Sequence, residues 1–332
     1  IEPYKGKIYD PCCGSGGMFV QSVKFIENHK GDKKDVSIYG QESLNTTYKL
    51  ARMNLVLRGI NGNLGESAQD TFHNDQHPTL TADFIMANPP FNFDGWRALN
   101  ELINDKRWDG YSVPPVSNAN YAWILHKISK LSEQGIAGFI LANGSLSAGG
   151  EEYKIRKKLI ENDLIEAIIT LPRNMFYSTD ISVTLWIINK NKTGNNYHLS
   201  DKKKNYRNRE GEVLFIDLRR LGSEFEKKYI ELTDEDIVNI KNIYHNWQQA
   251  SFKTEYENIP EFCQSVSFEK IEKEDFSLVP SKYIPFIDSD NEINFDEEML
   301  NMKTEFRSIL NQELSSQNEL LDALKKLGYE IE

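Results

Sequence analysis

Residues 7–20 read KIYDPCCGSGGMFV, and this stretch sets the expectation for the whole fold. Its apolar start predicts a β-strand, its glycines predict a tight turn, and the apolar residues after the turn predict a helix. Glycines in a strand-to-helix turn let a ligand approach the backbone closely, as in the dinucleotide-binding loops of doubly wound α/β proteins. The stretch therefore predicts the first strand, the ligand-binding loop and the first helix of such a domain.

A carboxylate, Asp10, precedes the glycines and indicates the charge of the ligand. Asp10 would repel a pyrophosphate, and the sequence has no Gly-Lys-Ser/Thr to hold a nucleoside triphosphate. A cationic ligand fits better, and S-adenosylmethionine carries an ammonium group with which Asp10 is expected to pair. The loop residues expected to hold that cofactor are Gly14, Ser15, Gly16 and Gly17.

The next predicted strand, residues 36–42 with the sequence VSIYGQE, ends in an acid. An acidic side chain at the tip of the second strand can accept hydrogen bonds from both hydroxyls of a ribose, as in other doubly wound nucleoside sites. We therefore expect Glu42 to bind the cofactor's ribose. The alternative is a surface acid at the start of a helix, where the helix dipole favours negative charge.

The tetrapeptide Asn88-Pro89-Pro90-Phe91 follows the apolar residues 83–87 and predicts a clamp for a planar NH2 group. The side-chain oxygen of Asn88 and the carbonyl of Pro89 can each accept one hydrogen of an exocyclic amine. The aromatic ring of Phe91 can stack on the ring that carries the amine. A Pro-rich turn closing an edge strand is the alternative, and the glycine loop upstream favours the clamp.

Beyond the clamp, apolar strands continue to alternate with helices. Near-continuous apolar strands between helices predict a mainly parallel sheet covered on both faces, which is the doubly wound class. Ligands of that class bind at the carboxyl ends of strands, where Asp10, Glu42 and Asn88 all fall. The expected helices are 118–133 and 151–162, and the expected strands are 136–141, 164–170, 182–189 and 213–217.

Taken together, the motifs resemble the modification (methylase) subunit of type I restriction-modification systems. The resemblance covers roughly residues 1 to 290, and its motifs are specific in combination. The segments that carry it are DPCCGSGG (10–17), YGQE (39–42), DTF (70–72), NDQHP (74–78), ANPPFN (87–92), NYAW (120–123), LANGSLS (141–147), LPRNMFYST (171–179) and GEVLFID (211–217).

The resemblance implies an S-adenosylmethionine-dependent methyltransferase that modifies N6 of adenine in DNA. The implied partners are duplex DNA, a DNA-recognition (specificity) subunit and a restriction subunit, with no membrane. In such an enzyme the two acceptors of the clamp favour a tetrahedral nitrogen that attacks the sulfonium methyl in line. The adenine must first be extruded from the duplex, and Phe91 would replace the stacking that it loses. Asp70 is expected near the cofactor's adenine ring, with a surface cap as the alternative.

Two rival functions stay open. An Asn-Pro-Pro-aromatic clamp suits any planar amine, so a methyltransferase acting on protein glutamine or on RNA is one rival, against which the segments after residue 120 argue. A truncated scaffold that only assembles with a partner is the other. Members of the family that the sequence resembles carry an N-terminal helical domain and, before the glycine loop, a short Phe/Tyr-Thr-Pro segment. Residues 1–5 contain no such element. A truncated chain is therefore expected.

The loop over residues 92–116 is long and rich in tryptophan, tyrosine and proline, so it is expected to be functional or irregular. Its aromatic residues are expected either to cover an extruded base or to pack beneath the loop. A net charge of −11, from 50 acids against 39 bases, has the wrong sign for holding DNA unaided. Either basic residues cluster or a partner grips the duplex. The densest basic stretch, 202–209, is expected to be a solvated loop or a phosphate contact.

Several classes of protein are disfavoured. No apolar run approaches a membrane span, and the first residues have no signal-peptide pattern, so a cytoplasmic protein is expected. Three cysteines cannot form a disulfide framework. Histidine spacing gives no metal site, and a Gly-x-Ser-x-Gly elbow is absent. Residues 288–293 imitate the first half of a calcium loop, but Ile293 stands at position six and Met299 at position twelve, where Gly and Glu are required.

We expect the catalytic domain to span 1–220, followed by a helical or irregular extension over 221–295 and one long helix over 296–332. Residues 233–236, TDED, predict the start of a helix that runs to about residue 250. The C-terminal helix is expected to contact another subunit, although closing this chain's own core is the alternative. Its apolar face consists of Met299, Met302, Phe306 and Ile309 and a neighbouring stripe of Leu310, Leu314, Gln317, Leu321 and Leu324.

Overall fold

The computed structural model describes residues 1–177, 180–194, 206–226, 228–250, 252–287 and 295–327. The calcium-like residues 288–293 and the basic residues 202–205 lie outside this described part. The chain divides into two compact units, residues 1–285 and residues 286–332.

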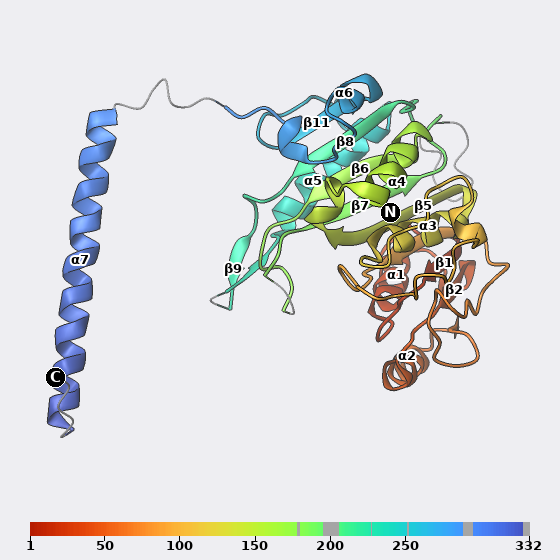
Figure 1. Ribbon diagram of the computed structural model, residues 1–332, viewed down its shortest axis with the longest axis horizontal. Coiled ribbons are helices and arrows are strands. Elements are labelled where there is room, and N and C mark those ends of the chain that lie inside the picture. The colour runs from red at the N-terminus through yellow and green to blue at the C-terminus, as the bar shows by residue number, and fades with distance from the viewer. Residues whose placement is uncertain (178–179, 195–205, 227, 251, 288–294, 328–332) are drawn as a thin grey trace. The chain divides into compact units, whose positions relative to one another are not determined.

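A nine-stranded sheet in the order β11-β8-β6-β7-β5-β4-β1-β2-β3 forms the centre of the first unit (Figure 1). β7 runs antiparallel to both of its neighbours, and β11 runs antiparallel to β8, while all other neighbours are parallel. The predicted doubly wound, mainly parallel sheet is therefore confirmed. Its strands are β1 (Gly6–Asp10), β2 (Val36–Gly40), β3 (Gly62–Asn63), β4 (Ala82–Ala87), β5 (Leu131–Ala142), β6 (Ile165–Thr170), β7 (Val183–Asn189), β8 (Glu212–Asp217) and β11 (Cys263–Ser267).

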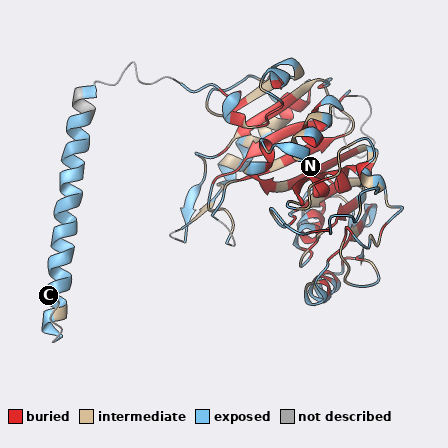
Figure 2. Ribbon diagram, in the orientation of Figure 1, coloured by how far each residue is buried: buried red, intermediate tan, exposed pale blue. Residues whose placement is uncertain are grey.

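Helices cover both faces of this sheet because its strands are apolar on both sides. Figure 2 shows the central strands as the most buried part of the unit, and every residue of β6 is buried. Residues of α3, α4 and α6 pack with one face, and residues of α1, α2 and α5 pack with the other. The helices are α1 (Gly17–Asn28), α2 (Asn45–Leu57), α3 (Asn120–Lys130), α4 (Gly150–Glu161), α5 (Asp234–Gln248) and α6 (Phe268–Lys273).

Residues 221–285 belong to the same compact unit as the sheet. β11 pairs with β8 along its whole length, and Trp247 of α5 is fully buried in the core. The predicted start of α5 is confirmed, since Thr233 and Asp236 form a reciprocal capping box. A short hairpin of β9 (Ser223–Phe225) and β10 (Tyr229–Glu231) also lies in this region.

The described end of the basic stretch is occupied by contacts within the protein. Arg207 donates to both carboxylate oxygens of Glu212, at 3.1 and 2.8 Å, and stacks over Trp247. Arg209 is fully buried, with one guanidinium nitrogen 3.7 Å from the buried Glu166 carboxylate. These two arginines stabilise the fold, so the expected phosphate contact does not apply to them.

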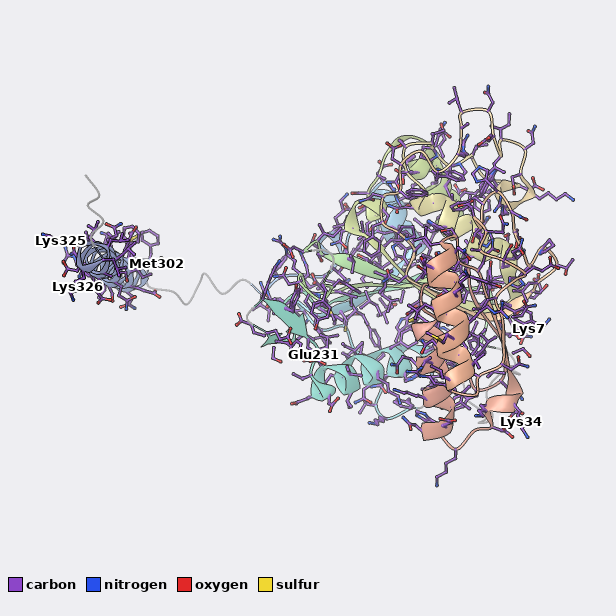
Figure 3. The ribbon with its side chains drawn as sticks, turned by 90° about the horizontal axis from the view of Figure 1, so that it is seen from below. Lys7, Lys34, Glu231, Met302, Lys325 and Lys326 are labelled. Carbon is purple, nitrogen blue, oxygen red and sulfur yellow. The ribbon has the colours of Figure 1, made fainter. Side chains whose placement is uncertain are left out.

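The second unit contains α7 (Phe295–Lys326), a helix of 32 residues that begins one residue before the predicted start and ends at Lys326, while residues 328–332 of the predicted range lie outside the described part. Its described side chains are exposed except for a partly exposed Leu324, and Met302 lies on the side away from Lys325 and Lys326 (Figure 3). The apolar residues of the predicted face are therefore without cover in this unit taken by itself. In the described part of the chain, no helix combines the length and apolar character needed to cross a membrane.

Candidate active site

The glycine loop joins the carboxyl end of β1 to α1. Gly14 and Gly16 adopt φ angles of 55° and 77°, which other residues rarely accept. A Cβ added at Gly14 or Gly17 would meet no atom within 4 Å. The turn thus requires glycine for its backbone angles and leaves its surface open to a ligand.

Asp10 ends β1 beneath this loop and is 2% exposed. Its carboxylate accepts a hydrogen bond of 3.0 Å from the Cys12 amide. Burial raises the pKa of Asp10 to about 7, although the Cys12 hydrogen bond and the nearby Lys127 cation act to lower it. A positively charged ligand at the loop would stabilise the ionised form further.

Glu42 follows β2 and contacts the glycine loop directly. One carboxylate oxygen accepts from the Gly14 amide at 3.0 Å, and the other accepts from the Leu44 amide at 2.9 Å. The second bond satisfies an amide at the start of α2, where Leu44 supplies no side-chain cap. Glu42 is buried, at 9% exposed, so the alternative of a surface acid holds only in its position at the helix start. The oxygen bonded to Leu44 also lies 3.5 Å from the Ser43 hydroxyl, so the oxygen bonded to Gly14 is the one that keeps a lone pair for a ligand hydroxyl.

Gln41, which the sequence analysis did not single out, is a further organiser of this edge and is fully buried. Its amide nitrogen donates to the carbonyls of Gln69 (3.1 Å) and Asn74 (2.8 Å). Its amide oxygen accepts from the Gln76 amide at 3.0 Å. Gln41 therefore fixes residues 69–77 to the end of β2. The sequence signal that could have identified Gln41 was a large polar residue directly after the apolar strand 36–40.

Asp70 lies in the segment that Gln41 fixes. One of its carboxylate oxygens accepts from the amides of Phe72 and His73, each at 2.9 Å, which is the capping role given above as the alternative. The next residue, Thr71, donates its hydroxyl hydrogen to the Pro11 carbonyl at 2.5 Å. Asp70 therefore caps a turn that lies against the glycine loop. Its second carboxylate oxygen accepts no hydrogen bond from the described residues.

The tetrapeptide clamp follows β4, which pairs with β1 in parallel register. Asn88 and Pro90 are exposed, Pro89 is buried, and Phe91 is half-buried against the core that includes α1. No described residue hydrogen-bonds the Asn88 side chain. Because β2, β1 and β4 are adjacent and parallel, their carboxyl ends bring Glu42, Asp10 and Asn88 to one edge of the sheet.

The chain beyond the clamp is fixed by a pair of asparagines that the sequence analysis also missed. The Asn120 side-chain oxygen accepts from the Asn92 amide at 3.1 Å, and its nitrogen donates to the Asn92 side-chain oxygen at 2.8 Å. Asn92 has a φ of 51°, a left-handed angle that asparagine tolerates better than most residues. This pair holds the residue after Phe91 against the start of α3.

The two tryptophans of loop 92–116 pack beneath the loop and are each 3% exposed. Trp96 donates to the Pro115 carbonyl at 2.7 Å, and Trp108 donates to the Leu102 carbonyl at 2.5 Å. The structure therefore favours the packing alternative for both rings. Phe93, at 45% exposed, remains accessible next to the clamp in sequence.

Polar side chains of α3 lie next to residues of β1 and of the glycine loop. Tyr9 of β1 and His126 share a hydrogen bond of 3.1 Å, and burial, followed by the charge of Arg107, lowers the pKa of His126 well below its usual value. Lys127 is fully buried with its ammonium 4.5 Å from the Phe139 ring centre. Burial lowers the pKa of Lys127 to about 8, while Cys12 and Asp10 act to raise it.

A hollow of about 580 Å³ lies elsewhere, along β2 and β3. None of the predicted site residues lines it, and its polar lining includes Lys33, Lys34, Asn61 and Asn63. Within the described residues, no group of three His, Cys, Asp or Glu side chains is arranged to hold a metal ion.

Comparison with known proteins gives consistent matches along the chain. The family profile for N-6 DNA methylases matches residues 1–292. The methylase subunit of the type I restriction enzyme HindI from Haemophilus influenzae is 40% identical over 337 residues, covering 99% of this chain and 70% of that protein. The MjaIX methylase subunit from Methanocaldococcus jannaschii is 35% identical, covering 98% of this chain and 56% of that protein.

A solved structure supports the same relationship. The type I restriction-modification methyltransferase subunit from Streptococcus thermophilus has a TM-score of 0.69 and 28% identity, covering 84% of this chain and 54% of that one. The chain thus spans about half to 70% of the length of these relatives. The resemblance drawn from the sequence motifs is confirmed: this chain belongs to the N-6 DNA methylase family, and within it is similar to type I restriction enzyme methylase subunits.

Proposed function

We propose that the chain transfers a methyl group from S-adenosylmethionine to N6 of adenine in DNA, as the modification subunit of a type I restriction-modification system. The observation that carries the proposal is the meeting of Glu42, Asp10 and Asn88 at the carboxyl ends of three adjacent parallel strands. The names of the relatives, methylase subunits of type I restriction enzymes, support the same activity.

The residues around the glycine loop fit S-adenosylmethionine. The buried Asp10 carboxylate suits the ligand's ammonium, and the open surface at Gly14 and Gly17 leaves room for backbone contact. Glu42 is held beside Gly14, and the carboxylate oxygen that accepts from Gly14 keeps a lone pair for a ribose hydroxyl. We assign Ser15 and Gly16 to cofactor binding as parts of the same loop. We assign the second carboxylate oxygen of Asp70 to the adenine of the cofactor. When bound, the cofactor supplies an activated methyl group.

Asn88, Pro89, Pro90 and Phe91 are assigned to the adenine that receives the methyl group. The Asn88 side-chain oxygen and the Pro89 carbonyl each accept one hydrogen of the N6 amine. Holding both hydrogens draws the nitrogen lone pair out of conjugation and directs it at the methyl group, so orientation and preorganised acceptors provide the catalysis. Phe91 stacks on the extruded base, whose removal from the duplex costs a few kcal/mol.

Partners complete the proposal. The net charge of −11 disfavours tight DNA binding by this chain alone. We assign the grip on DNA to a specificity subunit, which α7 contacts through its exposed apolar residues. A restriction subunit would join the same assembly. We further assign residues 1–220 to catalysis, 221–295 to a helical or irregular extension and 296–332 to subunit contact.

Labelled S-adenosylmethionine and an adenine-containing duplex test the function. Label should enter DNA when the chain is assembled with its specificity subunit, and transfer should be much weaker without that subunit. Label in protein or RNA under the same conditions would support the amide or RNA-amine rival. An assembled complex that transfers no label to any acceptor would overturn the proposal in favour of a scaffold.

A further inference from the structure

Side-chain contacts join two segments that follow different strands, residues 69–77 after β3 and residues 92–116 after β4. Residues 69–77 carry Asp70 and lie against the glycine loop through the 2.5 Å bond from Thr71 to Pro11. Residues 92–116 follow the amine clamp directly. Arg107 and His73 connect the two segments, one in the interior and one at the surface.

The interior connection is made by Arg107. Its guanidinium donates to the carbonyls of Thr71 (3.1 Å) and Phe72 (2.6 Å). Asp105 pairs with the same guanidinium at 2.7 Å, and only 11% of the Arg107 side chain is exposed. Arg107 is mostly buried, pairs with Asp105 and donates to two carbonyls. It therefore holds the part of loop 92–116 around residues 105–107 in one position relative to residues 69–77.

The surface connection is made by His73. One ring nitrogen lies 2.9 Å from the Asp70 carboxylate, and the other lies 3.2 Å from the Glu101 carboxylate of the loop. A neutral imidazole has a single N–H, so both bonds form together only when the ring is protonated. Glu101 also accepts from the Ala98 amide at 2.9 Å, and Arg97 is the other charged group that acts on it.

We infer that His73 is a positioning residue that couples the cofactor side of the site, at Asp70, to loop 92–116 beside the amine clamp. The inference rests on the proposed function, which assigns the second Asp70 oxygen to the cofactor. A ligand on that oxygen fixes the Asp70 carboxylate, which in turn fixes His73 and the Glu101 end of the loop. Cofactor binding then orders loop 92–116, which follows the clamp directly in sequence.

The protonation of His73 sets the pH range of this coupling. The hydrogen bond to Asp70, opposed by desolvation and helped by Glu101, raises the pKa of His73. A raised pKa means that the doubly bonded, protonated form is present at low pH and is lost as pH rises through the folded-state value. The coupling should therefore be fully present below the ordinary histidine pKa of about 6.5 and be lost at pH values above the raised pKa of His73.

Hydrogen exchange of loop 92–116 in the 332-residue chain, with and without S-adenosylmethionine, tests the inference. The variants are His73→Phe and Glu101→Ala, and Asp109→Ala is the control because Asp109 is an exposed acid of the same loop. Without ligand, both test variants should speed loop exchange relative to the control by about 1.5- to 5-fold, the range for a partly exposed ion pair. That difference should shrink as pH rises.

With S-adenosylmethionine, the parent and the control should show slower loop exchange, and the two test variants should lose most of this slowing while still binding the ligand by calorimetry. Equal slowing in His73→Phe and the parent, with binding intact, would overturn the coupling alone. Failure of the parent to bind the ligand would overturn the proposed cofactor site. If the parent does not bind the ligand and the test variants exchange like the control without ligand, the contact between His73 and Glu101 would also be shown not to hold the loop.

Discussion

Replacing Asn88 by alanine should abolish most methyl transfer without weakening the fold or the cofactor site. Asn88 is exposed, and its side chain hydrogen-bonds no described residue. Its loss should therefore change the free energy of unfolding by less than about 0.5 kcal/mol, as is usual for surface positions without special contacts. Asp10 and Glu42, which are proposed to hold the cofactor, belong to other strand ends, so cofactor affinity should change little.

The effect on rate is expected to be large because Asn88 supplies one of only two proposed acceptors for the amine. By analogy with removal of one preorganised oxyanion-hole donor, the rate should fall about 10²- to 10³-fold, or roughly 3 to 4 kcal/mol in activation free energy. The variant Asn88→Asp keeps an acceptor oxygen at the same place and should retain more activity than Asn88→Ala.

Single-turnover methylation of an adenine-containing duplex by the assembled complex measures this effect, with calorimetry for cofactor affinity and urea unfolding for stability. A parent-like rate in Asn88→Ala would refute the clamp. A large loss of cofactor affinity in the same variant would also refute the reasoning, because it would move Asn88 to the cofactor side of the site.

Cofactor binding should weaken by up to about tenfold for each pH unit below about 7, because Asp10 must be ionised to hold the ammonium. Calorimetry should find weaker, pH-independent binding in the Asp10→Asn variant. The Glu42→Ala variant should also bind the cofactor weakly. Gln41→Leu should lower the free energy of unfolding by about 2 to 4 kcal/mol in a urea titration, because three backbone partners lose their hydrogen bonds; a parent-like midpoint would refute its organising role. Deleting residues 296–332 should leave a folded sheet unit that no longer co-purifies with the specificity subunit, and a truncated protein that still assembles would show that α7 is not the contact.

The sheet, and the strand ends at which Asp10, Glu42 and Asn88 lie, were predictable because their signals are local. An apolar strand followed by a glycine loop, an acid or Asn-Pro-Pro-Phe identifies a strand end from neighbouring residues alone. Parallel strands then bring Asp10, Glu42 and Asn88 to one edge, whatever the details of packing. The bounds of α7 were equally accessible, since an amphipathic pattern without glycine or proline defines a helix from sequence.

The residues that organise the site were not predictable because their roles depend on distant partners. Gln41 acts on backbone groups 28 to 35 residues away, and Asn120 acts on Asn92 across 28 residues. Arg209 belongs to a run of basic residues that resembles a solvated loop, yet it is fully buried near Glu166. Pairings of this kind arise from the order of strands in the sheet, which the sequence pattern does not specify.

Mass spectrometry of nucleosides identifies the methylated atom, using duplex DNA treated with the assembled complex and S-adenosylmethionine that carries a deuterium-labelled methyl group. Labelled N6-methyladenine is expected with the parent chain, with a loss of about 10²-fold or more in Asn88→Ala. Label on cytosine, or unchanged N6-methyladenine in the Asn88→Ala complex, would refute methyl transfer to N6 through the Asn88 clamp.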